Sequence, residues 1–252
     1  MSTLVLVRHG KTEWSSQNRF AGWADAPLSA SGVQEARSAG RVLAAAGYRF
    51  DRAYTSYLCR AAETLQIILG ELGRPDLPVE RSWRLNERHY GSLQGYNRAK
   101  MVLQYGNESV AQWRRSFTAE PPALADGDAR LPALDPLYAG IDPALLPRSE
   151  SLKQAAARVA TWWHETLAPG LGGERQILVV AHTSSIRGLV REIEGLGDDD
   201  SAGFRIATAL PLVYTLDDAL QVVERQELAE GWSNRMRRFL NKHKPGTRIS
   251  WL

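Results

Sequence analysis

Short apolar runs that end abruptly in a polar turn occur close to the start of the chain and again in its last third. Leu4 to Val7 is an unbroken run of leucine and valine, and Ile177 to Val180 repeats the pattern. Runs of this length without alternation are typical of strands buried on both faces of a parallel sheet. A further short strand is predicted from Asp51 to Tyr54. The apolar pattern therefore predicts three strands in the interior of a sheet.

Segments of helical periodicity alternate with these strands, over residues 27–48, 58–73, 151–167 and 186–193. In the first of them Ser31 and Gln34 have the spacing of a capping box, and Gly47 is placed to end the helix. Alternating strands and helices are typical of the α/β class. We predict a doubly wound, mostly parallel sheet flanked by helices.

Between residues 83 and 150 this regular pattern breaks down into prolines and charges. Long irregular segments in compact domains are commonly functional loops or lids. We interpret the segment as an irregular or helical insertion over the active site. Residues 1–252 are predicted to form a single domain with a basic tail over about 229–252. We interpret the tail as a solvated terminal helix and tail, in preference to an anion-facing lid or a partner-binding patch.

Composition narrows the class of partner. The formal net charge of +3 suits a small anionic ligand and falls short of a nucleic-acid-binding composition. No apolar run has membrane-spanning length, and none resembles a signal peptide. The single cysteine, Cys59, cannot form an internal disulfide, which favours a reducing compartment. We expect a cytoplasmic protein without nucleic-acid or membrane partners.

Candidate chemistry lies where two of the strands end. His9 and His182 each follow an apolar run, at the carboxyl end of the predicted strand, where ligands bind in open α/β sheets. Either histidine alone is more simply structural. Several arginines share their neighbourhoods, namely Arg8, Arg60, Arg114, Arg115 and Arg187. Guanidinium groups match phosphate or carboxylate in pairs of hydrogen bonds, and the combination indicates a phosphate site.

A histidine in a phosphate site suggests covalent catalysis. His9 is the better candidate for a neutral imidazole that attacks phosphorus, with His182 as a hydrogen-bond donor to the transferring oxygens. The leaving oxygen needs a proton, for which Glu87 is the candidate, and burial is expected to raise its pKa. Spacing alone leaves open the alternative that Glu87 merely pairs with Arg84 or Arg88.

Other phosphate machinery is not visible in the sequence. The remaining histidines, His89, His164 and His243, lack the paired spacing of metal ligands, so a metal site is disfavoured. Neither a Walker-type phosphate loop nor a dinucleotide-type GxGxxG motif is present.

Longer motifs carry a resemblance to a known family. They are VRHG at 7–10, RFAGWADAPLSASG at 19–32, YTSYLCRAAETL at 54–65, SWRLNERHYGSLQGYN at 82–97, QWRRSF at 112–117, DPLYAGIDPALLPRSESL at 135–152, AHTSSIR at 181–187 and PLVYTLD at 211–217. With these motifs the chain resembles the cofactor-dependent phosphoglycerate mutases of the histidine phosphatase superfamily.

That resemblance implies roles for particular residues. It implies that His9 becomes phosphorylated, that Arg8, Arg60 and His182 hold the transferring phosphoryl group, and that Glu87 donates the proton. The residues it assigns to the substrate's carboxylate and far end are Tyr90, Arg98, Arg114 and Arg115. It further implies a glycolytic interconversion of 2- and 3-phosphoglycerate without metal, primed by 2,3-bisphosphoglycerate or an equivalent phosphoryl donor, in a dimer or tetramer.

Several positions expected to contact substrate depart from the family's pattern. They are Lys11, Thr12, Ser15, Ala21 before Gly22, Arg98 in place of a lysine, and Thr183 and Ser184 in place of Gly-Asn. The cations and the proton donor are kept, whereas neutral groups that orient the ligand have changed. The sequence therefore leaves three functions open. The first is a mutase-type phosphoryl transferase that acts on phosphoglycerate or on a related small phosphorylated acid. The second is a phosphatase of a small phosphorylated metabolite, and the third, least favoured, is a non-catalytic anion-binding pseudoenzyme.

Overall fold

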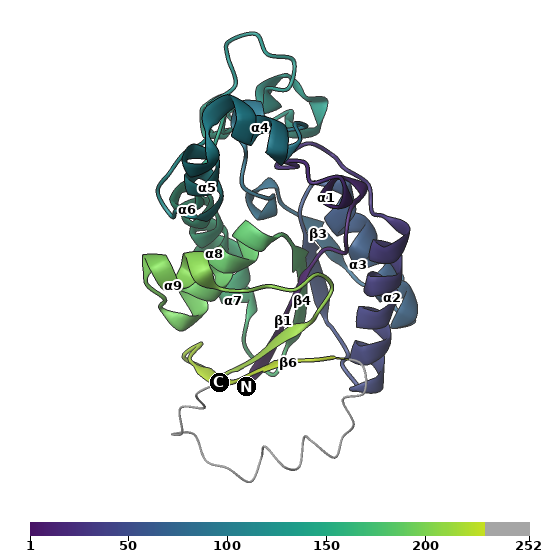
Figure 1. Ribbon diagram of the computed structural model, residues 1–252. Helices are drawn as coiled ribbons and strands as arrows, with labels where there is room; N and C mark the ends of the chain where they lie inside the picture. Colours follow the sequence, from purple (N-terminus) through teal and green to yellow (C-terminus); the bar gives the residue numbers. More distant parts are fainter. Residues whose placement is uncertain (230–252) are drawn as a thin grey trace, which may run out of the picture.

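A mixed sheet of six strands forms the centre of the protein, in a computed structural model that describes residues 1–229 (Figure 1). The strands are β1 (Ser2–Arg8), β2 (Arg52–Thr55), β3 (Val79–Arg81), β4 (Gln176–Ala181), β5 (Leu212–Leu216) and β6 (Val222–Glu227). Their order is β3-β2-β4-β1-β5-β6, with β1 to β4 parallel and β5 and β6 antiparallel. The predicted fold class is confirmed. In addition to the predicted parallel strands, the antiparallel strands β5 and β6 extend one edge of the sheet.

Strand β1 shows why the apolar runs predict buried strands. Leu4 and Leu6 belong to the buried cluster on one face of the sheet, whereas Val5 and Val7 belong to the cluster on the other. Because side chains alternate along a strand, an unbroken apolar run places hydrophobic groups on both faces.

Helices cover the two faces in pairs. α2 (Ala30–Ala45) and α3 (Cys59–Glu71) pack on one face, and α6 (Leu152–Trp162) and α8 (Thr183–Glu194) on the other (Figure 1). α6 and α8 approach closely at Gly188, where a Cβ would lie 3.1 Å from the Cβ of Val159. This contact fixes the start of α8, which borders the candidate site, relative to α6.

The ends of the predicted helices differ in detail from the structure. The capping box at Ser31 and Gln34 was wrong, because Ser29 is the N-cap and its hydroxyl accepts from the backbone N–H of Gly32 at 3.2 Å. Gly47 follows the end of α2 with a φ of +79°, which favours glycine. The helix predicted to run from Ser151 begins there and ends in a π-helical turn, η6 (Trp163–Leu167), followed by α7 (Ala168–Gly170).

The segment over 83–150 is built from short helices and loops. It holds α4 (Arg98–Tyr105), α5 (Asn107–Arg115) and the 3-10 turns η1 (Trp83–Leu85), η2 (Gly91–Leu93), η3 (Pro132–Leu134), η4 (Pro136–Tyr138) and η5 (Pro143–Leu145). α4 and α5 lie beyond the carboxyl ends of β1 and β4 (Figure 1). A buried cluster of Phe20, Leu93, Met101 and Val110 joins them to the loop after β1.

Two short helices complete the described part, α1 (Glu13–Ser16) after β1 and α9 (Asp198–Gly203) after α8. Within residues 1–229, no helix has the length and apolar character needed to cross a bilayer. The predicted basic tail lies outside the described residues, apart from its first position.

Candidate active site

The two histidines lie beside each other at the carboxyl ends of neighbouring strands. β1 and β4 pair with Arg8 opposite Ala181, and the N–H of His9 donates to the carbonyl of Ala181 at 3.0 Å. The ring centroids of His9 and His182 are 4.9 Å apart. The structure thus brings together the two histidines, as the apolar runs predict.

The tautomer of His9 follows from its hydrogen bond. Nδ1 lies 2.7 Å from the carbonyl oxygen of Gly10, which can only accept, so Nδ1 carries the proton. A neutral ring then has its lone pair on Nε2, which lies 3.4 Å from Nε of Arg60. Gly10 is required because a Cβ would lie 2.3 Å from the carbonyl oxygen of Gly32 in α2. His9 is therefore held with an unprotonated nitrogen beside a guanidinium group.

Arg60 is a buried cation that the loop after β1 holds in place. It is the second residue of α3 and is 1% exposed. Its two terminal nitrogens donate to the carbonyls of Ala24 and Gly22, at 3.0 and 2.7 Å. Arg8 is fixed in a similar way, by a hydrogen bond to the carbonyl of Ile206 at 3.1 Å, and its Nε is buried without a partner among the described residues. Both guanidinium groups border the same cavity.

His182 is the N-cap of α8 and is fully buried. Its Nε2 lies 2.7 Å from the hydroxyl of Ser56, the residue that follows β2. Its Nδ1 is buried and has no hydrogen-bond partner within residues 1–229. Because a buried polar nitrogen without a partner is costly, its placement beside His9 suggests a partner supplied by a ligand.

Both histidines are neutral in the folded protein. Burial, followed by the charges of Arg60 and Arg8, lowers the pKa of His9 well below its usual value. Burial and the charge of Arg60 do the same to the pKa of His182. An uncharged His9 keeps its lone pair at neutral pH, as a nucleophile requires.

These lowered pKa values predict an acid-sensitive fold. His89 is also buried, and burial with the charges of Arg158 and Arg130 lowers its pKa to about 3. Below the ordinary histidine pKa these three histidines bind protons in the unfolded chain, whereas the buried side chains of His9, His89 and His182 stay neutral in the folded protein. The free energy of unfolding therefore falls as pH falls, by about 1.4 kcal/mol per pH unit for each histidine. Urea unfolding without phosphate is expected to give a free energy roughly 4 kcal/mol lower at about pH 5.5 than at pH 7.5.

The matched control for that experiment is His164→Gln, which changes an exposed histidine outside the buried set. His89→Gln is expected to remove about a third of the slope. A free energy of unfolding that stays constant over this range would show that the buried histidines take up protons in the folded protein as readily as in the unfolded chain.

Glu87 borders the cavity from the inserted segment. Its Oε1 accepts the backbone N–H of Arg88 at 2.8 Å and that of Ser184, in the first turn of α8, at 3.1 Å. Arg84, the other candidate partner, pairs instead with Glu165. Glu87 therefore connects the inserted segment to the start of α8.

The expected raised pKa of Glu87 was wrong. Burial by itself raises it, but the hydrogen bonds from Ser184 and Arg88 and the charges of Arg60 and Arg88 outweigh that effect, and the pKa lies below its usual value. The sequence indicates burial and cationic neighbours, but it does not show the two N–H groups that converge on the carboxylate.

Two of the altered positions stabilise a turn beside the cavity. The hydroxyl of Thr12 accepts the N–H of Ser15 at 3.1 Å, and the hydroxyl of Ser15 accepts the N–H of Thr12 at 3.1 Å and donates to its carbonyl at 2.7 Å. Both residues border the cavity. Their hydroxyls are thus used within the capping box of α1.

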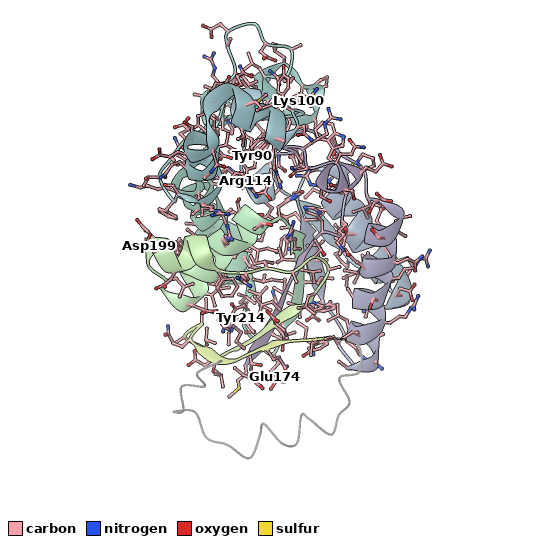
Figure 2. All side chains as sticks on the ribbon, viewed as in Figure 1. Tyr90, Lys100, Arg114, Glu174, Asp199 and Tyr214 are labelled. Atoms are coloured by element: carbon pink, nitrogen blue, oxygen red, sulfur yellow. The ribbon has the colours of Figure 1, made fainter. Side chains whose placement is uncertain are left out.

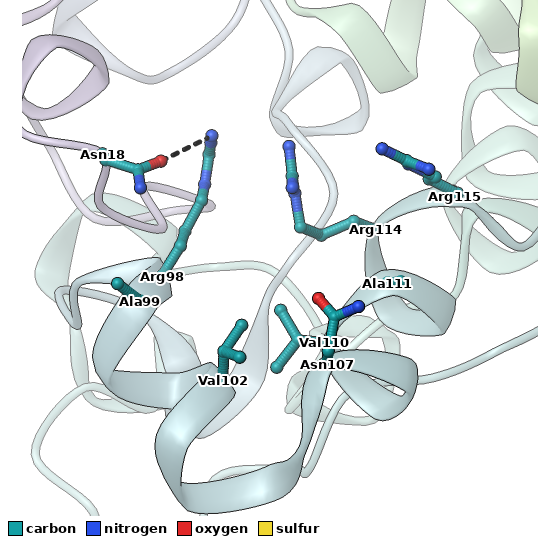
Figure 3. A pocket seen from close by; sticks show the side chains of 9 residues that line it. All are labelled: Asn18, Arg98, Ala99, Val102, Asn107, Val110, Ala111, Arg114 and Arg115. Atoms are coloured by element: carbon teal, nitrogen blue, oxygen red, sulfur yellow. Dashed lines mark hydrogen bonds between the residues drawn. The ribbon is translucent and has the colours of Figure 1, made fainter.

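Arginines from the inserted segment form the opposite wall. Arg98 begins α4, and Arg114 and Arg115 end α5; their guanidinium groups stand in a row, with Arg98 donating to Oδ1 of Asn18 at 3.4 Å (Figure 3). Tyr90 and Arg114 lie together below α4, between α4 and the sheet (Figure 2). None of the three arginines has a carboxylate partner in the described part of the chain.

The cavity itself has a volume of about 370 Å³. Most of the residues predicted from the sequence border it: Arg8, His9, Thr12, Ser15, Ala21, Arg60, Glu87, Tyr90, Arg98, Arg114, Arg115, Thr183 and Ser184. Three predicted residues are not on its wall. His182 is fully buried, with its ring centroid 4.9 Å from that of His9. Lys11 is half-exposed and pairs with Glu35 at 2.9 Å, and Gly22 contributes its carbonyl to Arg60.

Two further arginines on the cavity wall, Arg19 and Arg88, were not predicted from the sequence, whereas Arg187, one of the arginines named for the phosphate site, also borders the cavity. Arg88 is 3% exposed and donates to the hydroxyl of Tyr90 at 2.9 Å, while its Nε and Nη1 have no hydrogen-bond partner among the described residues. Adjacency was the available signal, since Arg88 follows Glu87 directly. The wall therefore carries eight arginines and one carboxylate.

A comparison with known families decides what this site belongs to. The family model described as histidine phosphatase superfamily (branch 1) matches residues 4–131 and 135–228. The chain belongs to the histidine phosphatase superfamily. A 2,3-bisphosphoglycerate-dependent phosphoglycerate mutase of Nitrosococcus oceani is 47% identical over 227 residues, which cover 90% of this chain and 95% of that protein.

Solved structures show the same histidine phosphatase fold at lower identity. YhfR of Bacillus stearothermophilus has a TM-score of 0.67 and 22% identity, with 92% of this chain and 97% of that chain covered. A mycobacterial glucosyl-3-phosphoglycerate phosphatase has a TM-score of 0.67 and 23% identity, with 92% and 99% covered.

In this member of the histidine phosphatase superfamily, residues 1–229 contain no group of three or more His, Cys, Asp or Glu side chains that could hold a metal ion. Independence from metal stays a prediction.

Proposed function

We propose that the protein interconverts 2- and 3-phosphoglycerate by phosphoryl transfer through a phosphorylated His9, primed by 2,3-bisphosphoglycerate. The observation that carries this proposal is the unprotonated Nε2 of His9, beside buried Arg60 and in one cavity with Glu87. The 47% identity to a 2,3-bisphosphoglycerate-dependent mutase supports this choice of reaction and primer.

In the first step, the lone pair of His9 Nε2 attacks phosphorus and the ester P–O bond breaks. Arg8, Arg60 and His182 stabilise the negative charge on the transferring oxygens, as preorganised cations and donors do in phosphoryl transfer. The carboxyl group of Glu87 gives its proton to the leaving oxygen. The phosphohistidine then returns its phosphoryl group to a hydroxyl by the reverse of these steps, with Glu87 accepting that hydroxyl's proton.

Glu87 must be protonated to act as the acid, and substrate binding favours this. In the free site the hydrogen bond from Ser184 and the charges of Arg60 and Arg88 lower its pKa. A bound phosphate brings negative charge beside these cations, which removes much of their effect on Glu87 and raises its pKa. Binding of the substrate thus favours the protonated form of Glu87 that the reaction needs.

The arginine wall suits the other end of the substrate. Arg98, Arg114 and Arg115 offer planar guanidinium groups without carboxylate partners in residues 1–229. Such groups bind a carboxylate or a second phosphate through paired hydrogen bonds. We assign them to the carboxylate of phosphoglycerate and the second phosphate of the primer.

The experiment that tests the proposal is ³¹P NMR of the protein with 3-phosphoglycerate, with and without 2,3-bisphosphoglycerate. We expect 2-phosphoglycerate to accumulate in the primed sample, with little free phosphate. Free phosphate alone would contradict the mutase assignment and indicate a phosphatase. No change in any phosphorus signal would contradict turnover of this substrate and favour binding only.

The proposal includes a cytoplasmic location and assembly as a dimer or tetramer. The location rests on the single cysteine, Cys59, which favours a reducing compartment, and the assembly rests on the family resemblance. Light scattering of the purified protein measures the assembly directly.

A further inference from the structure

Arg158, on α6, donates hydrogen bonds to four backbone carbonyls of the segment that carries Glu87. Arg158 donates from Nη1 to the carbonyls of Trp83 at 3.3 Å, Arg84 at 2.7 Å and Asn86 at 3.3 Å. Its Nη2 donates to the carbonyl of Glu87 itself at 3.3 Å. Only a short 3-10 turn, η1, orders this segment locally: the N–H of Asn86 donates to the carbonyl of Trp83 at 2.9 Å, whereas the carbonyls of Arg84, Asn86 and Glu87 rely on side chains for partners.

Arg158 is itself fixed by a buried ion pair. Its Nε and Nη2 donate to the two oxygens of Glu150, at 2.7 and 2.9 Å, and the two side chains are 7% and 4% exposed. The guanidinium group also lies near the rings of Trp23 and Trp83, 5.5 and 5.9 Å from their centroids. A planar group with five N–H donors can reach all six acceptors when one N–H of Nη1 is shared between two carbonyls, and a lysine ammonium with three donors cannot.

Glu150 holds the other side of Glu87. Its Oε2 accepts the backbone N–H of His89 at 2.8 Å, and its own N–H donates to the carbonyl of His89 at 2.8 Å. Arg158 therefore holds the backbone from Trp83 to Glu87, and Glu150 holds the backbone of His89, two residues after Glu87. The indole N–H of Trp23 adds a hydrogen bond to the carbonyl of Glu87 at 2.5 Å.

This arrangement connects Glu87 to the start of α8. Arg158 lies on α6 beside Val159, which packs against Gly188 of α8. The first turn of α8 supplies the Ser184 N–H that holds the Glu87 carboxylate. The backbone of Glu87 is thus held from α6 and its carboxylate from α8, and these two helices pack against each other.

We propose that Arg158 and Glu150 are positioning residues that hold Glu87 within reach of the leaving oxygen, and this rests on the proposed role of Glu87 as proton donor. Neither side chain borders the cavity, so both act through Glu87. Loss of their contacts is expected to misplace the acid while leaving His9 and the phosphate-binding arginines intact. Misplacing a reacting group by about 1 Å costs on the order of a hundredfold in rate.

The test compares two phosphoryl donors in single turnovers. 2,3-Bisphosphoglycerate has an alkoxide leaving group that needs a proton, whereas the p-nitrophenolate of p-nitrophenyl phosphate leaves without one. Arg158→Lys keeps a positive charge opposite Glu150 but cannot reach the four carbonyls. We expect it to slow ³²P labelling of the protein by 2,3-bisphosphoglycerate roughly tenfold or more, and to slow the p-nitrophenolate burst by less than about threefold.

A second variant and a control guard against loss of the fold. Glu150→Gln keeps the size and one acceptor oxygen, and is expected to shift the two donors in the same direction by a smaller factor. The control is Arg84→Ala, which removes a side chain from the same segment but leaves its carbonyl for Arg158. Both rates of the control are expected to stay within about twofold of the original.

A double-mutant cycle separates positioning from general structure. In a Glu87→Gln background, adding Arg158→Lys is expected to change the labelling rate by less than about twofold, because the acid it positions is gone. An equal slowing of both donors, or a full effect in the Glu87→Gln background, would overturn the positioning role. If Glu87→Gln alone leaves labelling unchanged, the proposed role of Glu87 fails, and the positioning role falls with it.

Discussion

Replacement of His9 by alanine is expected to abolish formation of the phosphoenzyme. Nε2 of His9 is the unprotonated nitrogen beside Arg60, and alanine provides no atom to form the P–N bond. Loss of a nucleophile in other enzymes costs on the order of 10⁶ in rate, so labelling should fall below detection. The measurement is ³²P incorporation from labelled 2,3-bisphosphoglycerate, followed by mapping of the acid-labile phosphopeptide.

The control is His164→Ala, which removes an exposed histidine of η6 that pairs with Glu192. It is expected to label as the original protein does. Removal of His9 also opens space against Arg60, so the melting temperature of the variant must be compared before the result is interpreted. Labelling that persists in folded His9→Ala, or a phosphopeptide around His182, would assign the nucleophile elsewhere.

Three of the four strands with two buried faces were predicted. β1, β2 and β4 could be predicted because their residues are buried on both sides of the sheet. β5 is buried on both faces as well, but its residues were noted only as part of the motif at 211–217 and were not predicted as a strand. β3 has only three residues, all exposed, so it carries no apolar pattern. β6 lies at the sheet edge and is exposed over most of its length. These strands are specified by pairing with their neighbours, which is not visible in local periodicity.

The site could be predicted to the extent that its residues lie next to strand ends or in long motifs. His9 and His182 follow paired strands, and their meeting follows from the register of β1 with β4. Lys11 was misplaced because adjacency to His9 says nothing about the side chain's direction, and Glu35 on α2 draws the ammonium group away. The pKa of Glu87 could not be predicted because it depends on Ser184, which is 97 residues away in the chain.

The substituted positions have a structural account that the sequence does not give. Thr12 and Ser15 cap α1 with each other's hydroxyls. At the start of α8, the pair Thr183 and Ser184 keeps the backbone N–H that holds Glu87. Because this contact uses the backbone, it tolerates a change of side chain. Several substitutions thus fall where the geometry depends on main-chain groups.

Glu87→Gln is expected to separate two kinds of phosphoryl donor. Glutamine keeps the size and the oxygen that accepts from Ser184 and Arg88, but it has no proton to give at neutral pH. General acid catalysis contributes roughly 10²- to 10⁴-fold, so labelling by 2,3-bisphosphoglycerate should fall by about that factor. The p-nitrophenolate burst should fall by less than about tenfold, because that leaving group is stable as an anion.

Glu165→Gln is the matched control, since Glu165 is an exposed carboxylate that pairs with Arg84 outside the cavity. Both of its rates should remain unchanged. An equal loss for the two donors in Glu87→Gln would mean that the carboxylate orders the cationic wall and does not transfer a proton. A selective loss would instead assign the proton to Glu87, and the lowered pKa of the free carboxyl would then require that bound phosphate restores its protonation.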